Sequence, residues 1–111
     1  MIPSPTNSIM FSSLYLFIRN RAGSERSLLL RIQKGNEAAF KAFYDQHVRS
    51  TNYMAYGFTN QKLGAQDLSF ETLREIWDNR QSIDPDKPAK VLIAETMISI
   101  YQRNITYVHE N

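Results

Sequence analysis

Residues 28–47 read LLLRIQKGNEAAFKAFYDQH, and this stretch decides the fold class. Leu28, Leu29 and Ile32 at its start recur at helical spacing, which predicts a helix that begins at a Ser24 cap and runs to about Lys34. Gly35 is suited to end this helix as a C-cap residue. Asn36 is suited to cap the next helix, because its side chain can accept a hydrogen bond from the first turn. The stretch therefore predicts two consecutive helices joined by a very short turn.

Helical spacing continues on the C-terminal side of this stretch. Apolar residues recur at three- and four-residue steps from Asn36 to Phe58, and Gly57 with the polar run 59–62 ends that pattern. A third helix is expected from about Gly64 to Arg80, followed by a loop at 81–88 that contains two prolines and two aspartates. A fourth helix is expected from Pro88. No alternation typical of a strand is present, so the chain is predicted to be all-α: a compact bundle of four main helices over residues 24–108.

Composition excludes several classes of protein. The chain has 111 residues, which fits one domain. It has no cysteine, which excludes a disulfide scaffold, a zinc ribbon, an iron–sulfur site and a thiol enzyme, and agrees with a reducing compartment. His47 and His109 are far apart, and no phosphate-binding or nucleophile motif occurs. We therefore expect no enzyme, no cofactor, no metal and no small-molecule substrate.

The first 23 residues form a predicted N-terminal extension. Residues 9–18 read IMFSSLYLFI, which as a helix would reach about 15 Å, half of a bilayer core. This run is expected to be a short extra helix that packs on the domain, or a stretch upstream of the true start. The alternative is an anchor to a membrane surface or a partner. Arg19 and Arg21 account for the net charge of +2, so the rest is neutral and the electrostatic signal for nucleic-acid binding is weak.

A charge pattern marks the predicted 64–80 helix. Carboxylates lie four residues apart on one side of it, at Asp67, Glu71 and Glu75. Like charges at this spacing repel by a few tenths of a kcal/mol per pair, and Arg74 offsets part of that cost. The pattern is either a solvated acidic face or a docking surface for a basic partner. Phe70 lies at the edge of this face, and if its ring is exposed it favours the docking interpretation. If its ring instead packs against Trp77, Phe70 has only a structural role.

Two segments resemble a known family. The run at 28–47 resembles the start of region 2 in extracytoplasmic-function (ECF) sigma factors of bacterial RNA polymerase. The segment GAQDLSFETLREIWDNR at 64–80 resembles the helix that follows in that domain. The most recognisable positions of that helix are occupied by Asp67, Leu68, Glu71, Ile76 and Trp77. The resemblance covers residues 25–104, and the two motifs occur in the family's order and spacing.

The resemblance implies a transcription initiation module in the cytoplasm. The 64–80 helix would dock on the clamp helices of the largest subunit of core RNA polymerase. The loop at 81–88 and the start of the last helix would face the −10 promoter element, binding DNA weakly, and an anti-sigma factor is a further candidate partner. The implied polymerase-docking residues are Asp67, Phe70, Glu71, Arg74 and Glu75. The implied DNA-binding residues are Arg80, Lys87, Lys90 and Arg103.

The sequence also departs from the family. Phe70 stands where glutamine is usual, Val91 stands where an aromatic residue is expected, and Ser69 and Thr72 replace aliphatic residues. The family's second domain, which reads the −35 element, has no counterpart in these 111 residues. The alternative function is therefore a sigma-like interaction or regulatory domain that does not recognise promoters, and a membrane-associated role through residues 9–18 is a third.

Overall fold

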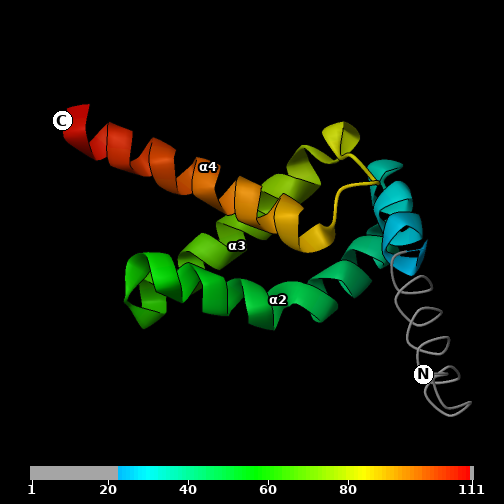
Figure 1. Cartoon of the computed structure of the whole chain (residues 1–111), viewed down its shortest axis with the longest axis horizontal. Coiled ribbons are helices and arrows are strands. Elements are labelled where there is room, and N and C mark those ends of the chain that lie inside the picture. The colour runs from blue at the N-terminus through cyan, green and yellow to red at the C-terminus, as the bar shows by residue number, and fades with distance from the viewer. Residues whose placement is uncertain (1–22, 111) are drawn as a thin grey trace, which may run out of the picture.

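The computed structural model describes residues 23–110, and this part of the chain is all-helical, with no strand (Figure 1). Its elements are an N-terminal helix described from 23 to 33, then α2 (Glu37–Thr59), α3 (Lys62–Asp78), the short 3₁₀-helix η1 (Arg80–Ser82) and α4 (Ala89–Glu110). The predicted all-α bundle of four main helices is confirmed. The apolar run at 9–18, with the extra helix or anchor predicted there, lies outside the described residues.

The turn between the N-terminal helix and α2 forms as the sequence predicts. Gly35 has φ +88°, a left-handed conformation that costs glycine little. The backbone N–H of Gly35 donates to the carbonyl of Ile32, and that of Asn36 to Arg31, which is the Schellman pattern of helix termination. The Asn36 side chain accepts a hydrogen bond of 3.0 Å from the N–H of Ala39. The predicted C-cap and N-cap are both confirmed.

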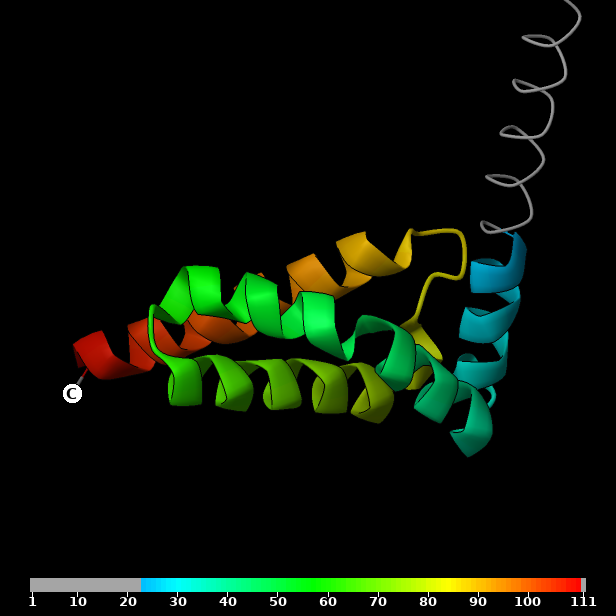
Figure 2. The ribbon, with the colours of Figure 1, turned by 90° about the horizontal axis from the view of Figure 1, so that it is seen from below.

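Two predicted helix starts are wrong, and one predicted helix end is confirmed in part. Ser24 caps nothing, because Gly23 and Ser24 are already helical. Gly57 lies inside α2, but α2 ends within the predicted polar run 59–62, where Asn60 has a left-handed conformation, φ 54°. α3 begins at Lys62 rather than Gly64, so only two residues separate it from α2, and the helices form an antiparallel hairpin (Figure 2). A glycine ends a helix only where the backbone turns left-handed, and here Asn60 makes that turn.

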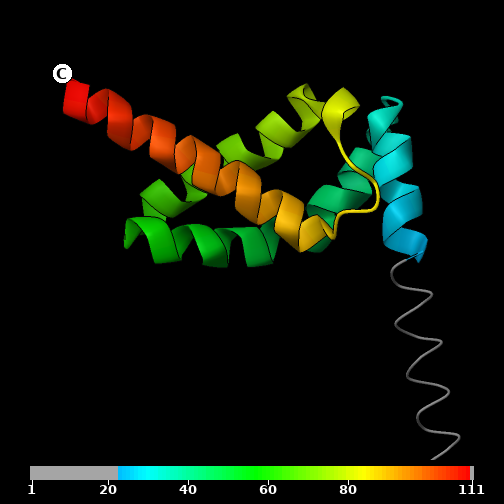
Figure 3. The ribbon, with the colours of Figure 1, turned by 45° about the horizontal axis from the view of Figure 1, so that its top comes forward.

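The interior consists of two apolar clusters. The larger one joins the N-terminal helix, α2, α3 and the start of α4, and its most buried large side chains are Leu29, Ile32, Phe43, Leu73 and Ile93. The smaller one lies toward the α2–α3 turn and consists of Ala55, Ala65, Leu68, Met97 and Ile100. Figure 3 shows α4 crossing the α2–α3 hairpin diagonally, so one helix contributes to both clusters.

Polar side chains lie between the two clusters. Thr51 on α2 and Thr72 on α3 are fully buried, and each hydroxyl donates 2.7 Å to a carbonyl one turn earlier on its own helix. Ser69 on α3 is also buried, but its hydroxyl has no hydrogen-bond partner. Because Ser69 and Thr72 are polar, α3 buries less apolar area in this layer than it would with aliphatic residues at these positions.

We expect Ser69→Ala to stabilise the protein by about 1 kcal/mol. A buried hydroxyl without a partner costs about 1–3 kcal/mol, and alanine is also the better helix former. In urea unfolding followed by circular dichroism, the midpoint should rise with no change in slope. Ser99→Ala, on the exposed side of α4, is the matched control and isolates the effect of burial. A Ser69→Ala variant less stable than the parent would show that the hydroxyl contributes a hydrogen bond.

Candidate functional site

The side of α3 that faces solvent carries the predicted docking residues. α3 buries Leu68, Leu73 and Ile76 against the rest of the bundle, and the spacing of these residues turns the opposite side outward. We call this opposite side the α3 flank. Its exposed members are Leu63, Asp67, Phe70, Glu71, Arg74 and Asp78. The outward orientation required by the docking interpretation is present.

The apolar part of the α3 flank consists of two large side chains. Phe70 is 59% exposed and Leu63 is 76% exposed, and their seven-residue spacing places them on one line along the helix. Trp77 does not cover Phe70. Its ring contacts Phe40, with centroids 5.0 Å apart, and the guanidinium of Arg80 lies over it at 4.4 Å. Sequence reasoning missed Leu63, although its spacing from Phe70 was a usable signal.

The carboxylates of the α3 flank are only partly neutralised. Within residues 23–105, Asp67 and Glu71 form no ion pair, and Arg74 lies 3.7 Å from Asp78. Glu75 differs from the others because its side chain is only 26% exposed and accepts a 2.6 Å hydrogen bond from Arg103 of α4. Glu75 therefore joins α3 to α4 at the margin of the α3 flank, and it contacts a partner less freely than Asp67 and Glu71.

A hollow of about 470 Å³ runs along the α3–α4 junction. Its lining residues are Glu71, Arg74, Glu75, Asp78, Asn79, Ile100 and Arg103. Arg103, predicted to bind DNA, thus lies among the predicted polymerase-docking residues.

The four predicted DNA-binding cations do not gather on one surface. Arg80 stacks on Trp77 and donates 3.0 Å to the Trp77 carbonyl, and Arg103 lies at the α3–α4 junction. Lys87, just before α4, lies 2.7 Å from Glu95, whose hydrogen bond and negative charge raise the pKa of Lys87. Of these four cations, only Lys90 is exposed and forms no ion pair with the side chains described for residues 23–105. Lys87 and Lys90 are therefore the only two that lie together, at the start of α4.

The loop before α4 is fastened to the N-terminal helix. Arg26 forms a 2.7 Å ion pair with Asp86, and the amide of Gln33 donates 3.2 Å to the carbonyl of Ile83. Within the loop, Asp84 accepts a hydrogen bond from the backbone N–H of Asp86. Sequence reasoning missed Arg26 and Gln33, because their partners lie at least 48 residues away along the chain. These contacts connect to the N-terminal helix the loop that the resemblance places against DNA.

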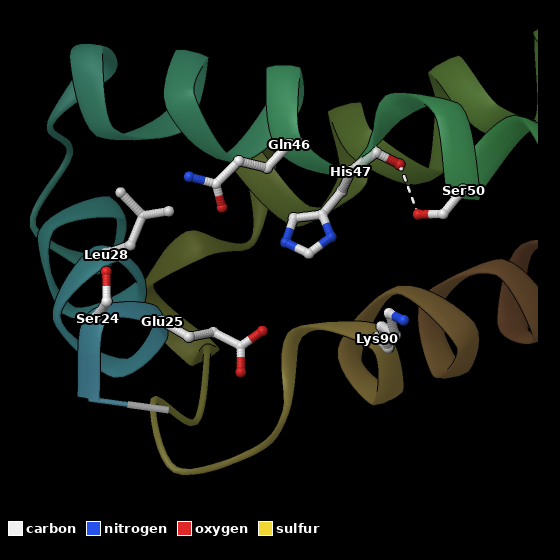
Figure 4. A pocket seen from close by; sticks show the side chains of 7 residues that line it. All are labelled: Ser24, Glu25, Leu28, Gln46, His47, Ser50 and Lys90. Carbon is white, nitrogen blue, oxygen red and sulfur yellow. Dashed lines mark hydrogen bonds between the residues drawn. The ribbon is translucent and has the colours of Figure 1, made fainter. Parts of the chain in front are cut away.

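A polar cavity of about 490 Å³ opens beside the start of α4. Figure 4 shows the His47 ring and the Glu25 carboxylate turned toward the space between the N-terminal helix, α2 and α4, with Lys90 across from Glu25. His47 is 8% exposed and its ring packs against Phe43, with centroids 4.7 Å apart. The ring therefore contributes to the core and lines the cavity, as expected for a partly buried helix residue.

Among the side chains described for residues 23–105, no cluster of His, Asp or Glu has the arrangement of a metal site. No helix in the described part of the chain combines the length and apolar character that crossing a membrane requires. Comparisons with models of protein families, with curated proteins and with solved structures found no match to this chain.

Proposed function

We propose that this chain is a helical docking module of the sigma region 2 type. In this proposal the α3 flank binds the clamp helices of core RNA polymerase, and the start of α4 contacts the −10 promoter element. The order and spacing of the two family-like segments, at 28–47 and 64–80, support it. The observation that carries it is the exposure of Phe70 beside two carboxylates, Asp67 and Glu71, that no cation neutralises within the described side chains.

The chemistry of the α3 flank selects the kind of partner. An apolar pair, Leu63 and Phe70, supplies the area that a protein interface removes from water. The adjacent carboxylates repel each other in the free protein, and a basic partner surface would relieve that repulsion on binding. A basic helical surface with an apolar seam fits both features.

Reversing the charge of the α3 flank tests the docking half of the proposal. We expect the double substitution Asp67→Arg, Glu71→Arg to weaken binding to core RNA polymerase at least about tenfold, because like charges facing each other across an interface cost several kcal/mol. Binding is measured by pull-down and titration with purified core enzyme. Both side chains are exposed, so the circular dichroism spectrum should not change.

A matched control carries the same charge change on another surface. Glu37→Arg with Asp45→Arg alters two exposed carboxylates of α2, which lie outside the α3 flank, and should bind polymerase like the parent. Equal binding by the parent and the α3 double variant would contradict the docking assignment, as would no binding by the parent.

A second candidate function is a sigma-like interaction or regulatory domain that binds polymerase without recognising promoters. The engagement of Arg80, Lys87 and Arg103 by groups of their own chain favours it, because cations already in use have less to offer phosphates. Single-stranded −10-like DNA, titrated at several salt concentrations, separates the candidates. Promoter contact through about three cations predicts a slope of log affinity on log salt near −2. Polymerase binding without DNA binding selects the second candidate.

A further inference from the structure

The outer side of α4 carries an apolar stripe that the bundle does not use. Val91 is 41% exposed, Ile98 41% and Ile105 39%, and the three lie seven residues apart. The side of α4 that faces the core consists instead of Ala89, Ile93, Met97 and Ile100. A surface helix of a monomer needs only one apolar stripe. The second stripe is a surface on which another helix can pack.

The intervening residues complete a heptad pattern. Ala94 and Tyr101 are half-buried and lie three residues after Val91 and Ile98, so apolar residues alternate at steps of three and four. The Tyr101 ring packs against Phe58 of α2, with centroids 5.0 Å apart, so this position borders the smaller apolar cluster. In the sequence, Val108 continues the same steps. The spacing is that of the a/d repeat of a coiled coil, with Val91, Ile98 and Ile105 at the a positions. β-branched residues at a positions occur in parallel two-stranded coiled coils, where leucine is the usual residue at d.

The charges beside the stripe indicate that the partner helix is a second α4. Lys90 precedes the first a position and Glu95 follows the first d position, so they occupy g and e positions of the heptad. In a parallel pair of helices, a g residue faces the e residue five positions further along the partner. Lys90 of one copy would thus face Glu95 of the other, twice by symmetry. Lys90 forms no ion pair within residues 23–105. The Glu95 side chain forms an ion pair with Lys87 of its own chain and is still 56% exposed.

We propose that this chain self-associates through α4 as a parallel two-stranded coiled coil, with the stripe Val91–Ile98–Ile105 at the interface. The C-terminal end of α4 extends beyond the α2–α3 turn (Figure 3), which leaves that part of the helix accessible to a second copy. The 22 residues of α4 span about 33 Å, or three heptads, so the association is weak and depends on concentration. This inference does not rest on the proposed function, but the two compete for the start of α4, because Lys90 faces DNA in one and a second copy in the other.

Sedimentation analysis of the full chain over a range of concentrations tests the proposal. The mass of the parent should rise from 12.9 kDa toward twice that value. Ile98→Glu places two carboxylates against each other in the seam and should weaken association at least about tenfold. Ser99→Glu adds the same charge one position further on, about 100° around the helix, and should associate like the parent. Because Ile98 and Ser99 are both exposed, neither variant should lose helicity.

Cross-linking determines the orientation of the two helices, because the chain has no cysteine of its own. In a parallel pair in register, each a residue meets its own copy, so Ile105→Cys should form a disulfide-linked dimer under mild oxidation. In an antiparallel pair centred near Ile98, residue 105 would face residue 91 instead. Ser99→Cys, which points away from the seam, should cross-link at least about tenfold more slowly.

Three results would overturn the proposal. The first is a parent chain whose mass stays at 12.9 kDa at every concentration. That result would count against self-association even if residues 1–22 or another protein covered the stripe. The second is Ile98→Glu associating as strongly as Ser99→Glu, which would place the contact elsewhere. The third is equal cross-linking of Ile105→Cys and Ser99→Cys, which would exclude the parallel register.

Discussion

Phe43→Ala should remove a large part of the stability of the domain. Phe43 is completely buried in the larger apolar cluster, where its ring stacks with Phe40 at 6.3 Å and contacts His47 at 4.7 Å. Truncating a buried phenylalanine costs about 3–5 kcal/mol, through the lost transfer free energy and the cavity left behind. A domain of ordinary stability has about 5–15 kcal/mol in total, so the variant should lose between about a fifth of its stability and all of it. Chemical unfolding followed by circular dichroism measures the loss.

The same substitution at Phe70 is the control for this experiment. Phe70 is 59% exposed, so alanine there should change the free energy of unfolding by no more than about 0.5 kcal/mol. A loss below about 1 kcal/mol in Phe43→Ala would mean that α2 is not fixed against α3 and the N-terminal helix by this side chain.

The features that could be predicted best are those that depend on residues close together in the sequence. Gly35 and Asn36 end one helix and begin the next through hydrogen bonds that reach no further than five residues, and both roles could be predicted. The outward orientation of Phe70 could also be predicted, because residue spacing on a helix fixes which side chains share a face. The end of α2 within the polar run 59–62 was predicted, but the choice of Asn60 rather than Gly57 for the left-handed turn, and the start of α3 at Lys62 rather than Gly64, were not.

Contacts between distant segments explain where the candidate site departed from expectation. The family resemblance implied that Arg80, Lys87, Lys90 and Arg103 would serve one DNA strand. Arg103 instead pairs with Glu75, 28 residues earlier in the chain, across the junction between α3 and α4. Lys87 pairs with Glu95 across the start of α4. Spacing within one helix cannot show which charges of two crossing helices meet, so the α3 flank was predictable and the DNA-binding set was not.

Phe70→Ala should reduce binding to core RNA polymerase by about 30-fold. If the α3 flank is the docking surface, Phe70 is its central aromatic anchor, and truncating such an anchor costs about 2 kcal/mol or more. Loss of binding without loss of stability is the expected signature, because the side chain is mostly exposed in the free protein and contributes little to folding. Titration with core enzyme, together with chemical unfolding, measures both quantities.

A second exposed aromatic residue makes this prediction specific. Tyr53 on α2 is 85% exposed and lies outside the α3 flank, so Tyr53→Ala removes a comparable apolar area and should bind polymerase like the parent. Leu63→Ala should fall between the two, since Leu63 lies on the same line as Phe70 but at the beginning of the helix. Raised salt should weaken binding of the parent and of Phe70→Ala by the same factor, because the carboxylates of Asp67 and Glu71 remain in both. Equal losses in Phe70→Ala and Tyr53→Ala would point to nonspecific apolar association and against a defined docking surface on α3.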